Sequence, residues 1–381
     1  MRVGVPKEGA ERERRVAAMP ATVKAYAELE WDVVVEFEAG LAAGFPDAEY
    51  VAAGAAIVPD PAASHDADLV IRVGPPTLDE VALIPREAVL CSFLDPFVAT
   101  DLVSALAAGG ITALAMEAIP RTTLAQSMDA LSSQATVGGY AAVLLAATAS
   151  PKFLPMLVTA AGTIPPARAL ILGAGVAGLQ AIATARRLGA VVHGYDIRAE
   201  TKEQVESLGA KFVEAPTASA DEGGYAKEVG TDVQQQQFET LTPFVADADI
   251  IVTTAQIPGR PAPLLITADM VAGMRPGSVI VDMAAATGGN VAGVQADGVV
   301  EVGGVAIHGP TDLPSRVPTD ASRMYARNLQ DLIARMRGDD GLVVDLDDEI
   351  IGGTTITHSG EVVHPRSRQV LGLDTGGEAS S

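Results

Sequence analysis

Residues 167–196 read ARALILGAGVAGLQAIATARRLGAVVHGYD, and this stretch decides the fold of the chain. The apolar run at 169–172 is typical of a buried strand, and the segment 176–188 is typical of a helix. A GxGxxG pattern, GAGVAG at 173–178, joins the two, and a second apolar run ends at Asp196, 18 residues beyond the last glycine. This order of strand, glycine turn, helix, strand and carboxylate predicts a dinucleotide-binding βαβ unit.

Each glycine has a separate physical role in such a unit. Gly173 permits the tight turn, Gly175 lets a pyrophosphate approach the backbone, and Gly178 allows the helix to lie close to the strand. The phosphates then bind the free N–H groups at the positive end of the helix. Asp196 accepts hydrogen bonds from the adenosine ribose and repels a 2′-phosphate, which favours NAD over NADP. We expect Arg198 to face solvent and so to leave this preference intact.

Apolar strands and helical stretches alternate along the whole chain, and the strands are nearly continuous apolar runs. Such runs are expected of parallel strands that helices cover on both faces. A second series of strands begins after Pro165 and Pro166. We therefore predict an α/β fold of two Rossmann-like, doubly wound parallel-sheet domains separated by a cleft. The first domain takes residues 1–125 and the returning segment 318–381, and the NAD-binding domain takes 126–317.

One segment of the second domain, 216–237, is long, polar and without apolar periodicity. Inside a compact domain, such a segment is usually either a functional loop or a flexible surface loop. We predict a mobile loop here, and Tyr225 is its lone aromatic residue.

Composition and charge exclude several classes of protein. Hydrophobic residues make up 48% of the chain and charged residues 19%, which is too apolar for a disordered chain. The net charge of −22 repels phosphate backbones and argues against nucleic-acid binding. The best candidate for a membrane helix, Tyr140–Ala149, has about half of the roughly 20 residues required. No signal sequence is predicted at the N-terminus, and the single cysteine, Cys91, excludes an intrachain disulfide and fits a reducing cytoplasm.

The sequence offers no obvious acid–base group for the oxidation of a hydroxy or amino acid, which needs a proton acceptor beside the reacting carbon. A structural or solvated role is expected for each of the five histidines: His65, His193, His308, His358 and His364. The last two flank a predicted C-terminal hairpin. Neither metal-ligand spacing nor a nucleophile elbow is present. The sequence thus combines a cofactor site with no evident proton acceptor.

A polar cluster, PRTTLAQSMDALSSQ at 120–134, lies upstream of the glycine loop. If Ser127 caps the helix that follows, Asp129 lies in its first turn, where the helix dipole stabilises a carboxylate. Ser132 then shares a face of the helix with Asp129, and an arginine and a glutamine precede the cap in a loop. From the residues alone, this cluster is either an ordinary capped helix or a ligand site.

The chain contains six long stretches that are specific to one family: VGVPKE at 3–8, IPRTTLAQSMDALSSQ at 119–134, residues 159–212 around the glycine loop, GGYAKE at 223–228, TTAQIPGRPAPLLIT at 253–267 and MRPGSVIVDMAAATGGN at 274–290. Over residues 1 to about 365, it resembles the NAD(H)-binding α subunit, or domain I, of the proton-translocating NAD(P) transhydrogenases. By this resemblance Arg121, Gln126 and Asp129 hold and orient the nicotinamide, and Ser132 contacts its carboxamide. Tyr225 belongs to a mobile loop that closes over the nucleotide.

The resemblance completes the predicted site. The predicted catalytic residues are Arg121, Gln126 and Asp129, and the predicted NAD-binding residues are Ser132, Gly173, Gly175, Val176, Ala177, Gly178, Asp196, Ile197, Arg198, Tyr225, Thr254 and Ala255. No metal ligand is predicted.

The resemblance also implies a Re/Si-specific NAD(P)⁺ transhydrogenase subunit that passes hydride directly from NADH to NADP⁺ held by a partner subunit. No substrate hydroxyl then releases a proton, and the main task is to bring the two C4 atoms to about 3–3.5 Å. Proton translocation is implied for a membrane-spanning partner subunit. We expect a homodimer in the cytoplasm that is peripheral at the inner membrane through its partner subunits.

Two other functions stay open. Alanine dehydrogenases share VGVPKE and an arginine near RVAAMP, but they use a lysine and a histidine for pyruvate binding and proton transfer. The counterpart segments here carry Arg72 in place of the lysine and, in LCSFLDPF at 90–97, no histidine. The second alternative is a non-catalytic NAD-sensing module, against which the joint presence of Arg121, Gln126 and Asp129 argues.

Overall fold

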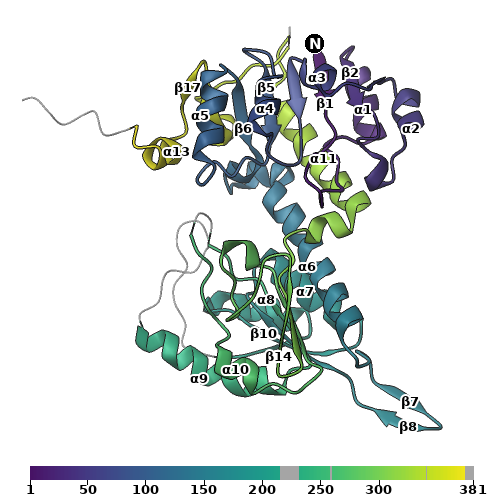
Figure 1. Ribbon diagram of the computed structural model, residues 1–381, viewed down its shortest axis with the longest axis vertical. Helices are drawn as coiled ribbons and strands as arrows, with labels where there is room; N and C mark the ends of the chain where they lie inside the picture. The colour runs from purple at the N-terminus through teal and green to yellow at the C-terminus, as the bar shows by residue number, and fades with distance from the viewer. Residues whose placement is uncertain (215–230, 258–259, 340, 374–381) are drawn as a thin grey trace, which may run out of the picture. The chain divides into compact units, whose positions relative to one another are not determined.

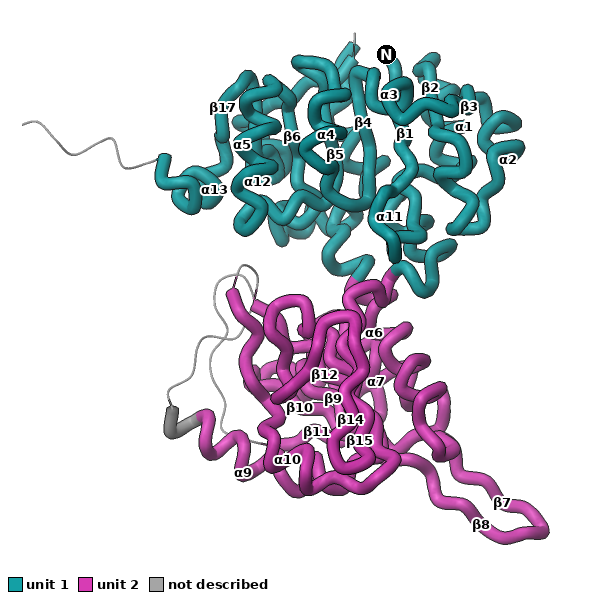
Figure 2. Tube along the Cα trace, viewed as in Figure 1, with its two compact units in different colours: residues 1–134, 315–381 teal, residues 135–314 magenta. Residues whose placement is uncertain are grey.

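The computed structural model describes residues 1–214, 231–257, 260–339 and 341–373. The chain forms two compact units (Figures 1 and 2). Unit 1 is Met1–Gln134 with Ser315–Ser381, and unit 2 is Ala135–Pro314. Each unit has its own mainly parallel sheet with helices around it. The predicted fold class, two Rossmann-like α/β domains, is confirmed.

The sheet of unit 1 has, in the described residues, eight strands in the spatial order β17-β16-β6-β5-β4-β1-β2-β3. Their bounds are β1 (Arg2–Val5), β2 (Asp32–Glu36), β3 (Ala56–Val58), β4 (Leu69–Ile71), β5 (Val89–Ser92), β6 (Thr112–Ala115), β16 (Thr355–His358) and β17 (Glu361–Val362). The first six are parallel, and β16 and β17 are antiparallel additions from the end of the chain. The strand order reverses between β1 and β4, as in a Rossmann sheet.

Helices cover both faces of this sheet (Figure 1). The helices of unit 1 are α1 (Pro20–Ala27), α2 (Asp47–Ala52), α3 (Pro61–His65), α4 (Leu78–Val81), α5 (Thr100–Ala108), α11 (Pro318–Met336), α12 (Glu349–Thr354) and α13 (Pro365–Val370). Leu69 and Ile71 belong to a core cluster with the apolar face of α11, whereas Val70 belongs to a cluster with α5. Alternate residues of one strand are therefore buried on opposite faces, which explains the continuous apolar runs.

The sheet of unit 2 has the spatial order β11-β10-β9-β12-β13-β15-β14 in the described residues. Its strands are β9 (Arg168–Leu172), β10 (Val191–Tyr195), β11 (Lys211–Phe212), β12 (Ile250–Thr253), β13 (Val279–Asp282), β14 (Val299–Val302) and β15 (Val305–His308). All are parallel except β14. The order again reverses, here between β9 and β12. At such a switch point the loops diverge and leave room for a ligand.

The remaining elements of unit 2 are the helices α7 (Val176–Arg187), α8 (Lys202–Ser207), α9 (Thr231–Asp247) and α10 (Ala268–Ala272), and a separate hairpin of β7 (Leu157–Thr159) and β8 (Gly162–Ile164). Helix α9 differs from the sequence prediction, because residues 231–237 form its beginning rather than the end of a loop. The prediction failed because four successive glutamines hide the amphipathic pattern, although Gln237 is buried and the helix continues through the buried Leu241 and Val245. The other residues of that loop, including Tyr225, lie outside the described residues.

Helix α6 (Ala130–Ala149) begins in unit 1 and continues in unit 2. It is long and apolar enough to cross a membrane, although its uninterrupted apolar run is shorter. Half of this stretch is buried within the protein. A Cβ atom at Gly139 would lie 2.1 Å from the carbonyl oxygen of Ala177, and one at Gly138 would lie 2.9 Å from Met283. Since these contacts place it against its own chain, we interpret α6 as a core helix.

Glu117, directly after β6, makes the stability of unit 1 depend on pH. Its Oε1 accepts hydrogen bonds from the backbone N–H groups of Leu94 and Asp95, and its buried Oε2 has no partner in the described structure. Burial raises the pKa of Glu117 from 4.5 to about 7. Between these pH values the folded state binds more protons than the unfolded state, so stability falls as the pH rises.

We expect Glu117→Gln to stabilise the protein at pH 8 by on the order of 2 kcal/mol, because the amide carries no charge to bury. Urea unfolding between pH 5 and pH 8 should show a flatter pH dependence for the variant. Glu361→Gln, at an exposed position in β17, is the matched control and should leave the native curve unchanged. Equal slopes for the native protein and Glu117→Gln would contradict this assignment.

Candidate functional site

The glycine loop connects β9 to α7 at the switch point of unit 2. Gly173 has a φ of +99°, a left-handed conformation that favours glycine. A Cβ atom at Gly178 would lie 1.8 Å from the carbonyl oxygen of Gly173, so only glycine fits there. The fold itself therefore requires the first and third glycines of the pattern.

The second glycine, Gly175, has a different environment. It precedes α7 with φ −77° and ψ −168°, an extended conformation that any residue adopts. Around a Cβ atom at this position, the one neighbour within 4 Å is the guanidinium of Arg198, at 4.0 Å. Beyond it, Val176 and Ala177 begin α7, and N–H groups in a first helical turn have no intrahelical partner. Gly175 thus leaves open space in front of a helix N-terminus, which is the cradle that a pyrophosphate needs.

Asp196 follows β10 and is 6% exposed. Its Oδ2 accepts a hydrogen bond of 2.7 Å from the backbone N–H of Ala174, which fixes the glycine loop. Arg198 binds the same carboxylate through its backbone N–H, Nε and Nη2 at 2.8–2.9 Å. The expectation that Arg198 faces solvent was therefore wrong, since the carboxylate draws the guanidinium inward. Ile197 lies between them and is half-buried.

Thr254 and Ala255 follow β12, the strand on the other side of the switch point. The Thr254 hydroxyl donates to the carbonyl oxygen of Gly173 at 3.2 Å. The Asn290 side chain accepts from the backbone N–H of Ala255 at 3.1 Å and donates to its carbonyl at 2.9 Å. Asp282, whose pKa burial raises, accepts from the backbone N–H of Asn290 at 2.7 Å. The sequence analysis missed Asp282 and Asn290, although an acidic residue at a strand end was a usable signal.

Four predicted residues of unit 1 line one polar pocket of about 330 Å³: Arg121, Gln126, Asp129 and Ser132. Gln126 lies on a 3₁₀ helix (Thr123–Met128) that leads into α6. Arg121 and Gln126 are exposed, whereas Asp129 and Ser132 are half-buried. The hydroxyl oxygen of Thr122, in the same lining, is buried and has no partner within the described residues. The pocket therefore combines a cation, an amide, a carboxylate and hydroxyl groups.

Asp129, and not Ser127, caps α6. Its Oδ1 accepts from the backbone N–H of Ser132 at 2.9 Å, and its Oδ2 accepts from the Ser132 hydroxyl at 2.6 Å. Ser127 lies within the 3₁₀ helix, which delays the start of α6 to Ala130. Both interpretations of this stretch thus apply, because the carboxylate that caps the helix also lines the pocket.

Asn328 of α11 supports this pocket from behind and was not predicted. Its Nδ2 donates to the carbonyl oxygen of Ser127 at 2.7 Å, and its Oδ1 accepts from the Ser133 hydroxyl at 2.6 Å. It is buried on the apolar face of α11. A polar residue within an otherwise apolar helical stripe was the available signal, since buried amides need partners.

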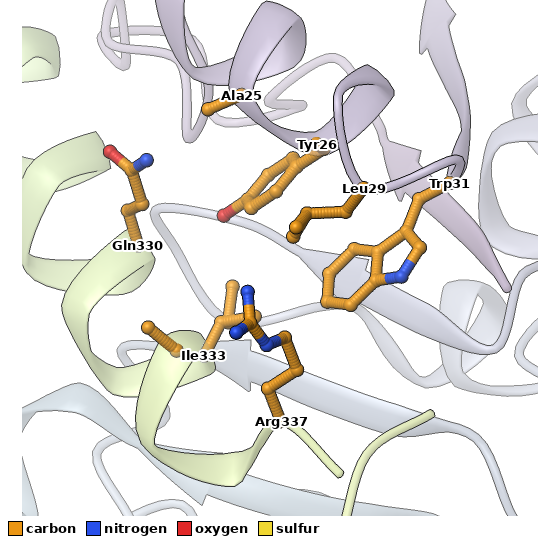
Figure 3. A pocket seen from close by; sticks show the side chains of 8 residues that line it. Ala25, Tyr26, Leu29, Trp31, Gln330, Ile333 and Arg337 are labelled. Atoms are coloured by element: carbon orange, nitrogen blue, oxygen red, sulfur yellow. The ribbon is translucent and has the colours of Figure 1, made fainter. Parts of the chain in front are cut away.

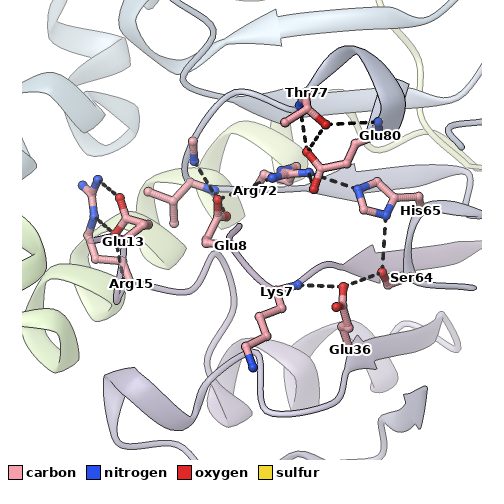
Figure 4. A network of polar contacts seen from close by, with 12 residues as sticks. Lys7, Glu8, Glu13, Arg15, Glu36, Ser64, His65, Arg72, Thr77 and Glu80 are labelled. Carbon is pink, nitrogen blue, oxygen red and sulfur yellow. Dashed lines mark hydrogen bonds and ion pairs between the residues drawn. The ribbon is translucent and has the colours of Figure 1, made fainter. Parts of the chain in front are cut away.

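A buried ionic network occupies the ends of β1 and β4 in unit 1 (Figure 4). Arg72 is 2% exposed, with Nη1 at 3.0 Å from Glu80 and Nη2 at 3.8 Å from Glu8. Burial raises the pKa of Glu8 to about 7, and Arg72 opposes this shift. Nδ1 of His65 binds the carbonyl of Pro61, so Nε2 accepts from Arg72. Burial lowers the pKa of His65, which keeps the ring neutral.

Arg15, the arginine of RVAAMP, is also neutralised by this chain. Its Nε and Nη2 bind the two carboxylate oxygens of Glu13 at 2.8 and 2.6 Å, and its Nη1 binds Gln134 at 2.8 Å. Neither Arg15 nor Arg72 can take up a substrate proton, because guanidinium stays charged in proteins. The counterparts of the alanine dehydrogenase residues therefore lack both the proton acceptor and an unpaired cation for pyruvate.

The predicted residues thus fall into two sets. Arg121, Gln126, Asp129 and Ser132 gather in unit 1, whereas the residues of the glycine loop, Asp196 to Arg198, Thr254 and Ala255 gather at the switch point of unit 2. Tyr225 lies outside the described residues.

Known proteins share both units. The family models described as alanine dehydrogenase/PNT, N-terminal domain and C-terminal domain match residues 4–138 and 142–365. An NAD(P) transhydrogenase subunit alpha of Rhodospirillum rubrum is 47% identical over 377 residues, which cover 96% of this chain and 98% of that protein. The resemblance found in the sequence is therefore confirmed.

Solved structures agree with this result. The transhydrogenase of Sinorhizobium meliloti matches with a TM-score of 0.85 and 43% identity, over 96% of this chain and 99% of that one. An L-alanine dehydrogenase matches with a TM-score of 0.82 and 28% identity, over 98% and 99%. The chain belongs to the alanine dehydrogenase/PNT family, and within this comparison it is more similar to the transhydrogenases than to the alanine dehydrogenase.

Proposed function

We propose that this chain is the NAD(H)-binding catalytic subunit of a Re/Si-specific, proton-translocating NAD(P)⁺ transhydrogenase. The observation that carries the proposal is the make-up of the unit 1 pocket. Arg121, Gln126 and the hydroxyl groups can hold a carboxamide-bearing ring, while both oxygens of Asp129 already bind Ser132. Such a pocket positions a ring and supplies no uncommitted base, which suits direct hydride transfer between two nicotinamides.

The NAD(H) component of the proposal rests on the glycine loop and Asp196. Gly175 leaves the approach to α7 open although the fold does not need glycine there. The Asp196 carboxylate lies at the end of β10, where it can accept hydrogen bonds from ribose hydroxyls. Ile197, Arg198, Thr254 and Ala255 complete this end of the site. Tyr225 is proposed, by resemblance, for the loop that closes over the nucleotide.

When bound, NADH supplies the hydride, and the chain's own residues orient its nicotinamide. We assign the carboxamide contacts to Arg121 and Ser132, and the exposed Gln126 to the junction with the second ring. An uncharged amide suits this junction, because it offers hydrogen bonds without fixing a charge between the rings. NADP(H) is held by a partner subunit, and a membrane-spanning partner couples the reaction to proton translocation. The chain itself is then peripheral at the membrane.

A homodimer fits the hairpin of β7 and β8. An isolated two-stranded hairpin is marginally stable in water, and this one exposes Met156, Val158 and Ile164 by 61%, 72% and 41%. We propose that a second copy covers these side chains. Sedimentation of the native protein at the mass of one chain would contradict the dimer.

Gly175→Ala separates binding from folding. We expect it to unfold like the native protein but to bind NADH at least about tenfold more weakly, since its methyl group occupies the space of the pyrophosphate. Gly178→Ala is the matched variant and should lose about 3 kcal/mol of stability through its clash with Gly173. Calorimetric titration and urea unfolding measure the two effects. Unchanged NADH affinity in Gly175→Ala would rule out the proposed phosphate cradle.

Gln126→Asn tests the role of the unit 1 pocket. The shorter amide keeps the chemical group but shifts it by one methylene, so hydride transfer should slow roughly 10- to 100-fold with little change in NADH affinity. Stopped-flow transfer in the reconstituted complex measures the rate. Ser127→Ala, on the same 3₁₀ helix but absent from the pocket lining, is the control and should transfer normally. Loss of NADH binding in Gln126→Asn would assign this residue to binding instead.

An assay with and without a partner tests the proposed function as a whole. The isolated chain should bind NADH without oxidising it, and it should reduce an NADP⁺ analogue only when an NADP(H)-binding transhydrogenase component is added. NADH oxidation with pyruvate and ammonia alone would identify an alanine dehydrogenase. NADH binding without transfer in the complete complex would identify an NAD-sensing module.

A further inference from the structure

A second, apolar pocket lies in unit 1 between the end of α1 and the end of α11 (Figure 3). We call it the α1–α11 pocket, and its main lining residues are Tyr26, Leu29, Trp31, Gln330, Ile333 and Arg337. Its volume is about 180 Å³, which corresponds to about six water molecules at ~30 Å³ each. This pocket shares no residue with the polar pocket around Arg121.

The Tyr26 hydroxyl is the first sign of a ligand. The side chain is 2% exposed, and its hydroxyl has no hydrogen-bond partner in the described stretches of the chain. Figure 3 shows this oxygen pointing into the pocket, toward Gln330 and Ile333 of α11. Burial of a hydroxyl without a partner is unfavourable by about 1–3 kcal/mol, so an acceptor supplied by a ligand would stabilise this arrangement.

The walls of the pocket define the rest of the ligand. Tyr26 and Trp31 stack with their ring centroids 5.6 Å apart and form a flat aromatic wall. Leu29 and Ile333 add aliphatic surface. The Arg337 side chain, just after α11, points back toward the two rings (Figure 3). Two donors, the phenol and the guanidinium, thus converge on an apolar space.

We propose that the α1–α11 pocket binds a compact monocarboxylate with a flat apolar body. The body lies against Tyr26 and Trp31, and the carboxylate accepts a hydrogen bond from Tyr26 and pairs with Arg337. A charge-assisted hydrogen bond from a buried phenol is stronger than one between neutral groups. This site is independent of the proposed nucleotide site, because its residues come only from α1, the turn before β2, and α11.

Trp31 is a specific reporter because it is the single tryptophan of the chain. Titration of the full chain with benzoate should shift the indole N–H resonance of Trp31 in a saturable way, with a dissociation constant in the millimolar range. Benzyl alcohol, which lacks the charge, and acetate, which lacks the flat body, should each bind at least about fivefold more weakly. Equal shifts with benzoate and benzyl alcohol would overturn the proposed carboxylate site.

Tyr26→Phe removes only the hydroxyl group. It should weaken benzoate binding roughly five- to tenfold and leave the thermal midpoint unchanged, since the hydroxyl has no partner within the described fold. Arg337→Gln should weaken benzoate but not benzyl alcohol. Arg327→Gln, on the exposed side of the same helix and paired with Asp331, is the matched control and should bind normally. Absence of a saturable shift, or native affinity in Tyr26→Phe, would show that the pocket is a packing defect filled by water.

Discussion

Direct contact between backbones at glycine is the constraint on which unit 2 depends. Gly178 of α7 lies so close to Gly173 that a Cβ atom would be 1.8 Å from its carbonyl oxygen, and Gly139 of α6 lies similarly close to Ala177. Contacts of this kind tolerate no methyl group, and they fix the distance of α7 from β9 and α6. The N-terminus of α7 is thereby held in place before any ligand arrives. Gly175, which makes no such contact, is left to serve the ligand.

The two units share a strand order but use their switch points differently. In unit 2, Asp196 and Asp282 bind backbone N–H groups and hold the loops apart around Gly175. In unit 1, Glu8 follows β1 and accepts from the backbone N–H groups of Val73 and Gly74 after β4, and Arg72 lies beside it. The carboxylate thus ties together the two loops that diverge in unit 2. The same fold therefore offers a nucleotide cradle in one unit and a closed ionic network in the other.

The features of the fold that local sequence controls were predictable. Continuous apolar strands, the GxGxxG turn and the C-terminal hairpin of β16 and β17 all follow from neighbouring residues. The start of α6 was misplaced, because a 3₁₀ turn let Asp129 replace Ser127 as the cap. Arg198 and Asn328 were misjudged or missed for a different reason. Their positions depend on which polar groups the folded chain buries beside them, and spacing along the sequence does not record this.

The Asp196–Arg198 pair bears on how the proposed site separates two similar nucleotides. The carboxylate already binds a guanidinium, so ribose hydroxyls must exchange with these hydrogen bonds, and such an exchange is nearly neutral in free energy. A 2′-phosphate meets a different balance, because repulsion from the carboxylate, about 4 kcal/mol per charge pair at 4 Å and an effective dielectric of 20, is offset by attraction to Arg198. The guanidinium is tied to Asp196 by two side-chain hydrogen bonds. Discrimination therefore depends on Arg198 staying with Asp196, because a guanidinium that turned to the phosphate would leave the carboxylate uncompensated.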